Sequence, residues 1–268
     1  MQIGGKTFDT DNRVYLMGIL NVTPDSFSDG GRYKELDAAL FHAEEMVKEG
    51  AAILDVGGES TRPGHTKISV DEEISRTALV IEKLRDRFDV PVSIDTYKSR
   101  VAEAALSAGA ALVNDIWGLK YDKNMAAVIA GSDAACCLMH NRDDAVYTDL
   151  AAEVCADLSD SVRLAKAAGI RDEQIMVDPG IGFGKTYEMN LEMLKRLGEL
   201  KSLGYPVLLG ASRKSVIGLT LDLPSDERLE GTLVTTVMGV MSGCSFVRVH
   251  DVKANLRAVR MAEAILGS

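Results

Sequence analysis

The 268-residue chain contains few of the residues that build zinc sites and disulfide frameworks. It has four histidines and four cysteines, which are Cys136, Cys137, Cys155 and Cys244. No two cysteines have Cys-x-x-Cys spacing, so the sequence offers no zinc framework. We expect free thiols, as in cytoplasmic proteins. Cys136 and Cys137 lie in an apolar run, and we expect both to be core residues.

Long apolar runs and an excess of basic charge are also missing. No apolar stretch is long enough to span a bilayer, and the N-terminus lacks the basic-then-apolar pattern of a secretory signal. Lys and Arg number 30 against 40 Asp and Glu, giving a net charge of −10. A nucleic-acid-binding face would need a basic stripe. We therefore expect a cytoplasmic protein that binds neither membrane nor nucleic acid, although a local cationic cluster could still bind an anionic substrate.

Short apolar runs alternate with segments of helical periodicity along the whole chain. The pattern predicts eight strands, at 14–20, 52–56, 91–95, 111–114, 134–139, 174–177, 206–209 and 245–249. It predicts helices at 36–48, 70–88, 99–108, 124–130, 150–168, 191–203 and 254–266, with a helix-rich segment over 213–241. No Pro- or Ser-rich linker interrupts this rhythm. We predict an α/β protein with one domain over 1–268, a (β/α)8 or TIM barrel, with an open doubly wound sheet as the alternative.

A long polar loop, residues 21–31 (NVTPDSFSDGG), follows the first predicted strand. Pro24 pushes Thr23 into an extended conformation and Asp29-Gly30-Gly31 is typical of a turn, so the segment is not helical. A loop longer than a connection requires commonly carries function. Its polar side chains suit a hydrated cation and phosphate oxygens, and Phe27 suits a flat organic ring. A surface turn without function is the alternative.

Polar side chains follow nearly every predicted strand, where the catalytic residues of a barrel cluster. They are Asn21, Asp55, Asp95, Asn114 with Asp115, His140, Asp178, Arg213 with Lys214, and Arg248 with His250. The opposite ends of the strands carry far fewer. An aspartate after a strand commonly caps the next helix. We favour this role for Asp115, leave it open for Asp55 and Asp95, and assign no role to His140.

The residues at the strand ends divide into two chemical sets. Asp95, Asn114 and Asp178 offer acceptors to the amino-pyrimidine edge of a heterocycle, and Lys214 could face its carbonyl oxygen. Arg248 and His250 share parity on the last strand, so their side chains point the same way. Together with Arg62 they suit a phosphate group. Surface salt bridges are the alternative for this second set.

A glycine-rich segment, residues 178–185 (DPGIGFGK), superficially resembles a phosphate-binding loop. It lacks the Gly-x-x-x-x-Gly-Lys-Ser/Thr spacing, so we do not predict a nucleotide site. We expect the glycines to let the backbone pass close to a flat ligand, with Phe183 nearby. No Ser-His-Asp order or reactive-cysteine context stands out, so covalent catalysis is not our first hypothesis.

Seven stretches, in one order along the chain, resemble the dihydropteroate synthase family. They are 18–31 (GILNVTPDSFSDGG), 55–64 (DVGGESTRPG), 93–98 (SIDTYK), 114–118 (NDIWG), 178–185 (DPGIGFGK), 212–215 (SRKS) and 248–252 (RVHDV). The resemblance implies a transferase of folate biosynthesis that condenses 6-hydroxymethyl-7,8-dihydropterin diphosphate with para-aminobenzoate. The products would be 7,8-dihydropteroate and pyrophosphate, with Mg²⁺ as cofactor. It also implies a homodimer, with the helix 231–243 as an interface, and competition by sulfonamides.

The resemblance assigns site residues position by position. The pterin would be held by Asp95, Asn114, Asp178 and Lys214, with Met139 and Phe183 in the pocket. The diphosphate would be held by Asn21, Arg62, Arg248 and His250, with Asn21 also contacting Mg²⁺. The para-aminobenzoate pocket would be shaped by Phe27, Thr61, Pro63 and Ser215. The residues expected to act in catalysis are Asp95, Lys214, Arg248 and His250.

Two departures from the family pattern, Ile181 and Val216, bear on inhibitor affinity more than on the reaction. The implied mechanism is loss of pyrophosphate ahead of attack by the arylamine, with an acidic pocket stabilising the methylene cation. A methyltetrahydrofolate methyltransferase and a catalytically silent pterin-binding protein are the alternatives. Pyrophosphate release separates all three.

Overall fold

The computed structural model describes residues 1–22, 31–59 and 67–267. Eight parallel strands form one sheet in the order β8-β7-β6-β5-β4-β3-β10-β9. A parallel bridge between Val177 and Val207 joins its two ends. The strands are β3 Tyr15–Asn21, β4 Ile53–Gly57, β5 Val92–Asp95, β6 Leu112–Asp115, β7 Ala135–Met139, β8 Ile175–Asp178, β9 Leu208–Leu209 and β10 Phe246–Val249. The predicted TIM barrel is confirmed, and the open sheet was wrong.

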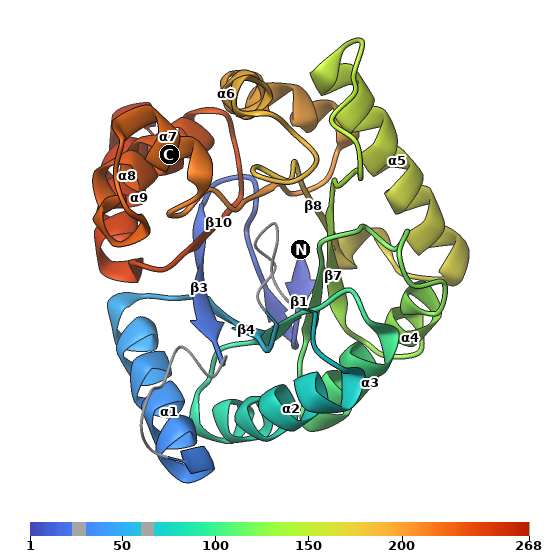
Figure 1. Cartoon of the computed structure of the whole chain (residues 1–268). Helices are drawn as coiled ribbons and strands as arrows, with labels where there is room; N and C mark the ends of the chain where they lie inside the picture. Colours follow the sequence, from blue (N-terminus) through green and yellow to red (C-terminus); the bar gives the residue numbers. More distant parts are fainter. Residues whose placement is uncertain (23–30, 60–66, 268) are drawn as a thin grey trace.

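Helices surround the ring of strands (Figure 1). They are α1 Gly31–Glu49, α2 Val70–Arg87, α3 Ser99–Ala108, α4 Met125–Ala130, α5 Leu150–Ala168, α6 Tyr187–Lys195, α7 Ser215–Leu221, α8 Leu229–Met241 and α9 Val252–Leu266. Two of them, α3 and α5, have the predicted limits because their stop signals are local. Gly109 and Gly169 follow them with φ of 110° and 101°, the left-handed conformation that ends a helix.

The predicted helix at 191–203 differs from the structure. α6 begins earlier because the Thr186 hydroxyl accepts the N–H of Met189, 3.3 Å away, as an N-cap. It ends at Lys195, and a 3-10 helix, η3 Leu197–Leu203, follows. The helix-rich segment 213–241 comprises α7, the 3-10 turn η4 Ser225–Glu227 and α8. α1 begins at Gly31 rather than at 36.

A short antiparallel hairpin, β1 Gln2–Ile3 and β2 Lys6–Thr7, was not predicted. Gly4 and Gly5 have φ of 56° and 74°, the left-handed pair that a tight hairpin turn requires. The hairpin carries Ile3, and Phe8 follows it; both are buried with the first residues of the strands inside the barrel. The N-terminus and β1 accordingly lie at the centre of the ring in Figure 1. The hairpin therefore closes the barrel at the amino ends of the strands.

The register of the strands aligns the polar residues at their carboxyl ends. Asn21 is paired with Gly57, Gly57 with Asp95, and Asp95 with Asn114. Met139 is paired with Asp178 further around the ring. Residues that lie far apart in the sequence therefore face one another across one mouth of the barrel, which is where a barrel carries its site.

Candidate active site

Arg248 joins two carboxylates at the barrel mouth. Its Nε donates to Asp55 Oδ2 at 2.6 Å and its Nη2 to Asp95 Oδ2 at 2.7 Å. Asn114 Nδ2 also donates to Asp55 Oδ2, at 3.3 Å. All four side chains are buried or nearly so, with Arg248 16% exposed. Charge-assisted bonds in such surroundings fix the side chains rigidly.

Two carboxylate oxygens of this cluster accept no hydrogen bond from the described residues. Oδ1 of Asp55 and Oδ1 of Asp95 are buried and have no hydrogen-bond partner within residues 1–22, 31–59 and 67–267. Leaving a buried carboxylate oxygen unpaired costs about 1 to 3 kcal/mol. An N–H group of a bound ligand would recover that cost at Asp95, which lies at the end of its strand.

Lys214 and Asp178 complete the polar set from the other side of the mouth. The Lys214 amine donates to the carbonyl of Ile181 and lies 4.6 Å from the centre of the Phe183 ring. Asp178 Oδ1 accepts the N–H of Gly180 at 2.6 Å. Gly210 lies next to both groups: a Cβ there would be in ordinary van der Waals contact, 3.4 Å from Asp178 Oδ2 and 4.0 Å from the Lys214 nitrogen.

Burial shifts the pKa of the charged groups in opposite directions. It raises the pKa of Asp95 to about 7, against the lowering effect of Arg248. It lowers the pKa of Lys214 to about 8, although Asp178 favours the charged amine. It also raises the pKa of Asp178, with Lys214 opposing. Such shifts gather at functional sites because a reaction requires groups held near their protonation midpoints.

An apolar wall lines the same mouth. Tyr97, Ile116 and Met139 form a small buried cluster, and Trp117 and Phe183 pack against it. The wall is separate from the larger core between barrel and helices. The Lys214 amine, 4.6 Å from the centre of the Phe183 ring, and Met139, paired with Asp178, connect this wall to the polar set. The combination suits an aromatic heterocycle with several N–H donors.

The chain matches the family model described as "Pterin binding enzyme" over residues 17–250. It is 57% identical over 267 residues to a dihydropteroate synthase of Clostridium beijerinckii, covering 99% of both chains. The chain belongs to the dihydropteroate synthase family. The resemblance of the seven stretches is thereby confirmed.

Solved structures agree over the whole fold. A dihydropteroate synthase of Clostridium difficile, crystallised in the presence of pteroic acid, has a TM-score of 0.94 at 55% identity, covering 97% of this chain and 99% of its own. A dihydropteroate synthase of Xanthomonas albilineans, with 4-aminobenzoic acid, has a TM-score of 0.93 at 40% identity, covering 99% and 97%. The chain is therefore an enzyme of this transferase family.

The residues expected to hold a pterin come together, and those expected to hold para-aminobenzoate are only partly described. Asp95, Asn114, Asp178, Lys214, Met139 and Phe183 all line the mouth described above. Phe27, Thr61, Arg62 and Pro63 lie outside the described residues. Ser215 is exposed at the first position of α7.

The residues assigned to the diphosphate are more scattered. Asn21 is exposed at the end of β3, close to Asp95 across Gly57. His250 Nδ1 contacts the Ser212 hydroxyl at 3.0 Å. Arg248 lies beside the residues assigned to the pterin, because its guanidinium is held by the carboxylates of Asp55 and Asp95. These assignments stay predictions.

The structure decides the roles of two aspartates for which the sequence suggested a helix cap. Asp55 caps no helix: it lies within β4 and holds Arg248 and Asn114. Asp115 accepts the N–H groups of Trp117 and Leu119, at 2.9 and 2.7 Å, and so stabilises a turn rather than capping α4. The predicted helix cap was therefore wrong for Asp115, because its carboxylate is used up by the turn that follows β6 and α4 begins only after Asn124.

The glycine-rich segment serves a contact that the sequence did not indicate. A Cβ on Gly180 would lie 2.0 Å from the His140 carbonyl oxygen, and one on Gly184 would lie 2.7 Å from the Arg142 backbone. Both glycines have positive φ. At these two positions the close approach is to neighbouring backbone and not to a ligand. Ile181 and Val216, the departures from the family pattern, are both buried in the large core.

We searched the described part of the chain for metal-ligand clusters and for membrane-spanning helices. No group of three or more His, Cys, Asp or Glu there could hold a metal ion. No helix there combines the length and the apolar character needed to cross a bilayer. All four cysteines are free, and Cys136 and Cys137 are buried as predicted.

Proposed function

We propose that the enzyme condenses 6-hydroxymethyl-7,8-dihydropterin diphosphate with para-aminobenzoate, giving 7,8-dihydropteroate and pyrophosphate. One observation carries the proposal: a buried carboxylate oxygen of Asp95 lies without a partner among the described residues, beside Asn114 and an apolar wall. A pterin presents N–H donors on a flat ring and a carbonyl oxygen that Lys214 could meet. Family membership supports the same substrate.

The chemistry begins with cleavage of the bond between the pterin methylene carbon and the diphosphate oxygen. The electron pair leaves with pyrophosphate, and the methylene carbon becomes a cation that the ring delocalises. The para-aminobenzoate nitrogen then forms the new C–N bond, and its proton passes to solvent. When all are ionised, the three carboxylates of Asp55, Asp95 and Asp178 outnumber the cations Arg248 and Lys214. The net negative charge favours the cation over the neutral reactant.

We propose that His250, Arg248, Asn21 and Arg62 receive the departing diphosphate. The Ser212 hydroxyl orients the His250 ring, and the exposed Asn21 amide stands beside Asp95 at the mouth. Arginine and histidine donors suit phosphate oxygens at neutral pH. Ser215, with the residues of the first two loops, would face the para-aminobenzoate.

We propose Mg²⁺ as the cofactor, with Asn21 as its protein ligand. Mg²⁺ in phosphate-transfer sites commonly keeps water and substrate phosphate oxygens as ligands and takes one or two from the protein. The exposed amide oxygen of Asn21 at the mouth fits that mode. When bound, the ion would neutralise charge on the diphosphate. Asn21→Ala should raise the Mg²⁺ concentration required for half-maximal activity.

Pyrophosphate release is the experiment that tests the function. The protein is incubated with Mg²⁺ and the pterin diphosphate, with and without para-aminobenzoate, and both products are quantified. Release that rises with the arylamine, with an equal amount of dihydropteroate, is expected. Pterin binding without release would favour a silent binder or a methyltransferase, and the diphosphate assignments would be withdrawn.

We also propose a homodimer formed through α8. Val234, Val237, Met238 and Met241 recur at helical spacing on this helix; Val234 and Met241 are well exposed, and the other two are half-buried. An apolar stripe of this kind marks an interaction surface. Light scattering after size exclusion should give twice the chain mass, and Val234→Glu should give the monomer. Val146→Glu, a change at an exposed valine in a loop, is the control and should leave the dimer intact.

We infer cytoplasmic surroundings for the enzyme. Cys136 and Cys137 are adjacent, buried and unpaired, which suits a reducing compartment. Titration of the denatured protein, purified without reductant, should give four thiols per chain. Fewer than four would contradict the inference.

A further inference from the structure

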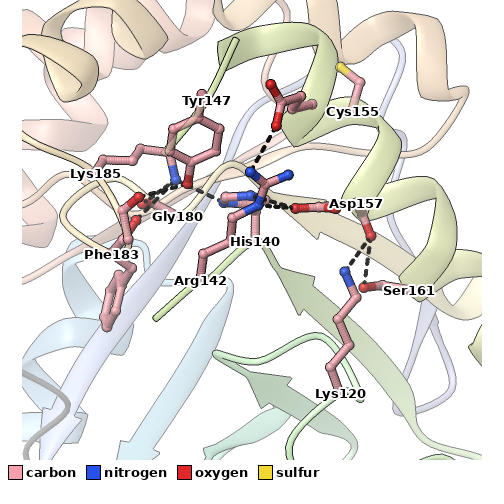
Figure 2. A network of polar contacts seen from close by, with 12 residues as sticks. Lys120, His140, Arg142, Tyr147, Cys155, Asp157, Ser161, Gly180, Phe183 and Lys185 are labelled. Carbon is pink, nitrogen blue, oxygen red and sulfur yellow. Dashed lines mark hydrogen bonds and ion pairs between the residues drawn. The ribbon is translucent and has the colours of Figure 1, made fainter. Parts of the chain in front are cut away.

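A second polar network lies behind the glycine-rich segment, and the proposed chemistry makes no use of it (Figure 2). Lys185 is at its centre. The Lys185 nitrogen lies 2.9 Å from His140 Nδ1 and donates to the carbonyl oxygens of Gly180 and Phe183, each at 3.1 Å. Burial lowers the pKa of Lys185 to about 7. In its protonated form the amine has three N–H donors, and three acceptors meet them here. The side chain therefore ties the two ends of the 180–183 segment to one point.

His140 connects that point to helix α5. Its side chain is fully buried, and Nε2 lies 3.2 Å from Asp157 Oδ2. Because an ionised carboxylate can only accept, Nε2 carries the ring proton and donates to Asp157, which leaves Nδ1 as the acceptor facing Lys185. Burial is the main cause that lowers the pKa of His140 to about 3, and the positive charge of Lys185 is the second. The ring is therefore neutral. Arg142 Nε also donates to Asp157, at 2.7 Å, and fixes the carboxylate.

The segment is also held along its backbone. Gly180 and Gly184 press against the chain at 140–142, where no side chain would fit. The Tyr147 hydroxyl donates to the Gly184 carbonyl at 2.7 Å. Figure 2 shows the Phe183 ring pointing away from this network, and Phe183 packs against the apolar wall of the pocket. One segment thus faces the network on one side and the pocket on the other.

The same segment also positions Lys214. The Ile181 carbonyl accepts from the Lys214 amine, and Ile181 lies between the two carbonyl groups that Lys185 holds. A shift of the segment would therefore move Phe183 and Lys214 together. Ser215, which the family assigns to the para-aminobenzoate side, follows Lys214 directly in the chain and is exposed at the start of α7.

We propose that Lys185, anchored through His140 and Asp157 to α5, is a positioning residue that sets Phe183 and Lys214 for the pterin and acts much less on the arylamine. The inference rests on the proposed function, since it takes the pterin to be the ring held there. It adds to that function a residue, Lys185, that affects binding of the pterin diphosphate without contacting it.

The test compares Lys185→Met with Lys166→Met, a change at an exposed lysine on α5. We expect Lys185→Met to raise the KM for the pterin diphosphate at least tenfold and to change the KM for para-aminobenzoate less than twofold. Lys166→Met should change neither. Lys185→Gln keeps two N–H donors for the two carbonyl groups and should give an intermediate KM, which preserves the test if the methionine variant does not fold.

Binding and fluorescence give readouts independent of turnover. Calorimetry with pteroic acid should show weaker binding to the folded Lys185→Met protein. Trp117, the single tryptophan, packs on the same apolar wall as Phe183, so its emission should shift. Unchanged pterin KM and unchanged emission in a folded variant would overturn the proposal, as would equal losses for both substrates. If wild-type protein released no pyrophosphate, the proposed function would fail instead.

Discussion

Replacing Asp95 with asparagine tests the cation-stabilising role of the pocket. Asn keeps the shape of the side chain and removes the charge that Asp95 carries above its pKa of about 7, so the two proteins are compared above that pH. At roughly 6 Å from the developing cation, with an effective dielectric constant of about 20, one carboxylate contributes about 3 kcal/mol. That corresponds to a fall in turnover of ~100-fold. The neutral pterin loses at most one hydrogen bond in the ground state, ~1 kcal/mol or about a fivefold weaker Kd.

The assay measures single-turnover rates of pyrophosphate release and the Kd of the pterin diphosphate for both proteins. Asp115→Asn is the matched control, because Asp115 is equally buried at a strand end but bonds only to backbone N–H groups. We expect it to lower stability and to preserve the single-turnover rate of the folded fraction. An equal loss of rate and affinity in Asp95→Asn would refute the reasoning.

Three further predictions concern the surroundings of the site. Gly180→Ala should lower the free energy of unfolding by about 3 to 4 kcal/mol in denaturant titrations, because the new Cβ would clash with the backbone of His140 and the residue has a positive φ. Gly169→Ala, the control, also has a positive φ but open space around it, and should cost ~1 kcal/mol. The buried neutral His140 binds its proton more weakly than in the unfolded chain, so stability should fall by up to ~1.4 kcal/mol per unit as pH drops below about 6.5; His140→Gln should flatten this slope. Asp251→Asn should raise the pterin KM about fivefold, since Asp251 holds Arg213, whose φ of 56° turns the next lysine to the pocket.

The local signals of the sequence determined the barrel and the family. Alternating strands and helices, with stop signals such as Gly109 and Gly169, depend on neighbours in the chain and could be predicted without the structure. The polar residues at the strand ends were predicted for the same reason, because parallel strands place those ends at one mouth.

The tertiary structure decided how those residues pair. Arg248 bonds to Asp55 and Asp95 across 193 and 153 positions, and only the closed register brings them together. From the sequence, Arg248 was assigned to phosphate, because a guanidinium binds phosphate and carboxylate equally well and the sequence does not show which one it meets. His140 was given no role, since burial and the contact with Lys185 arise only when the glycine-rich segment folds back on the neighbouring strand. Local propensity selects elements, whereas partners far apart in the chain are selected by packing.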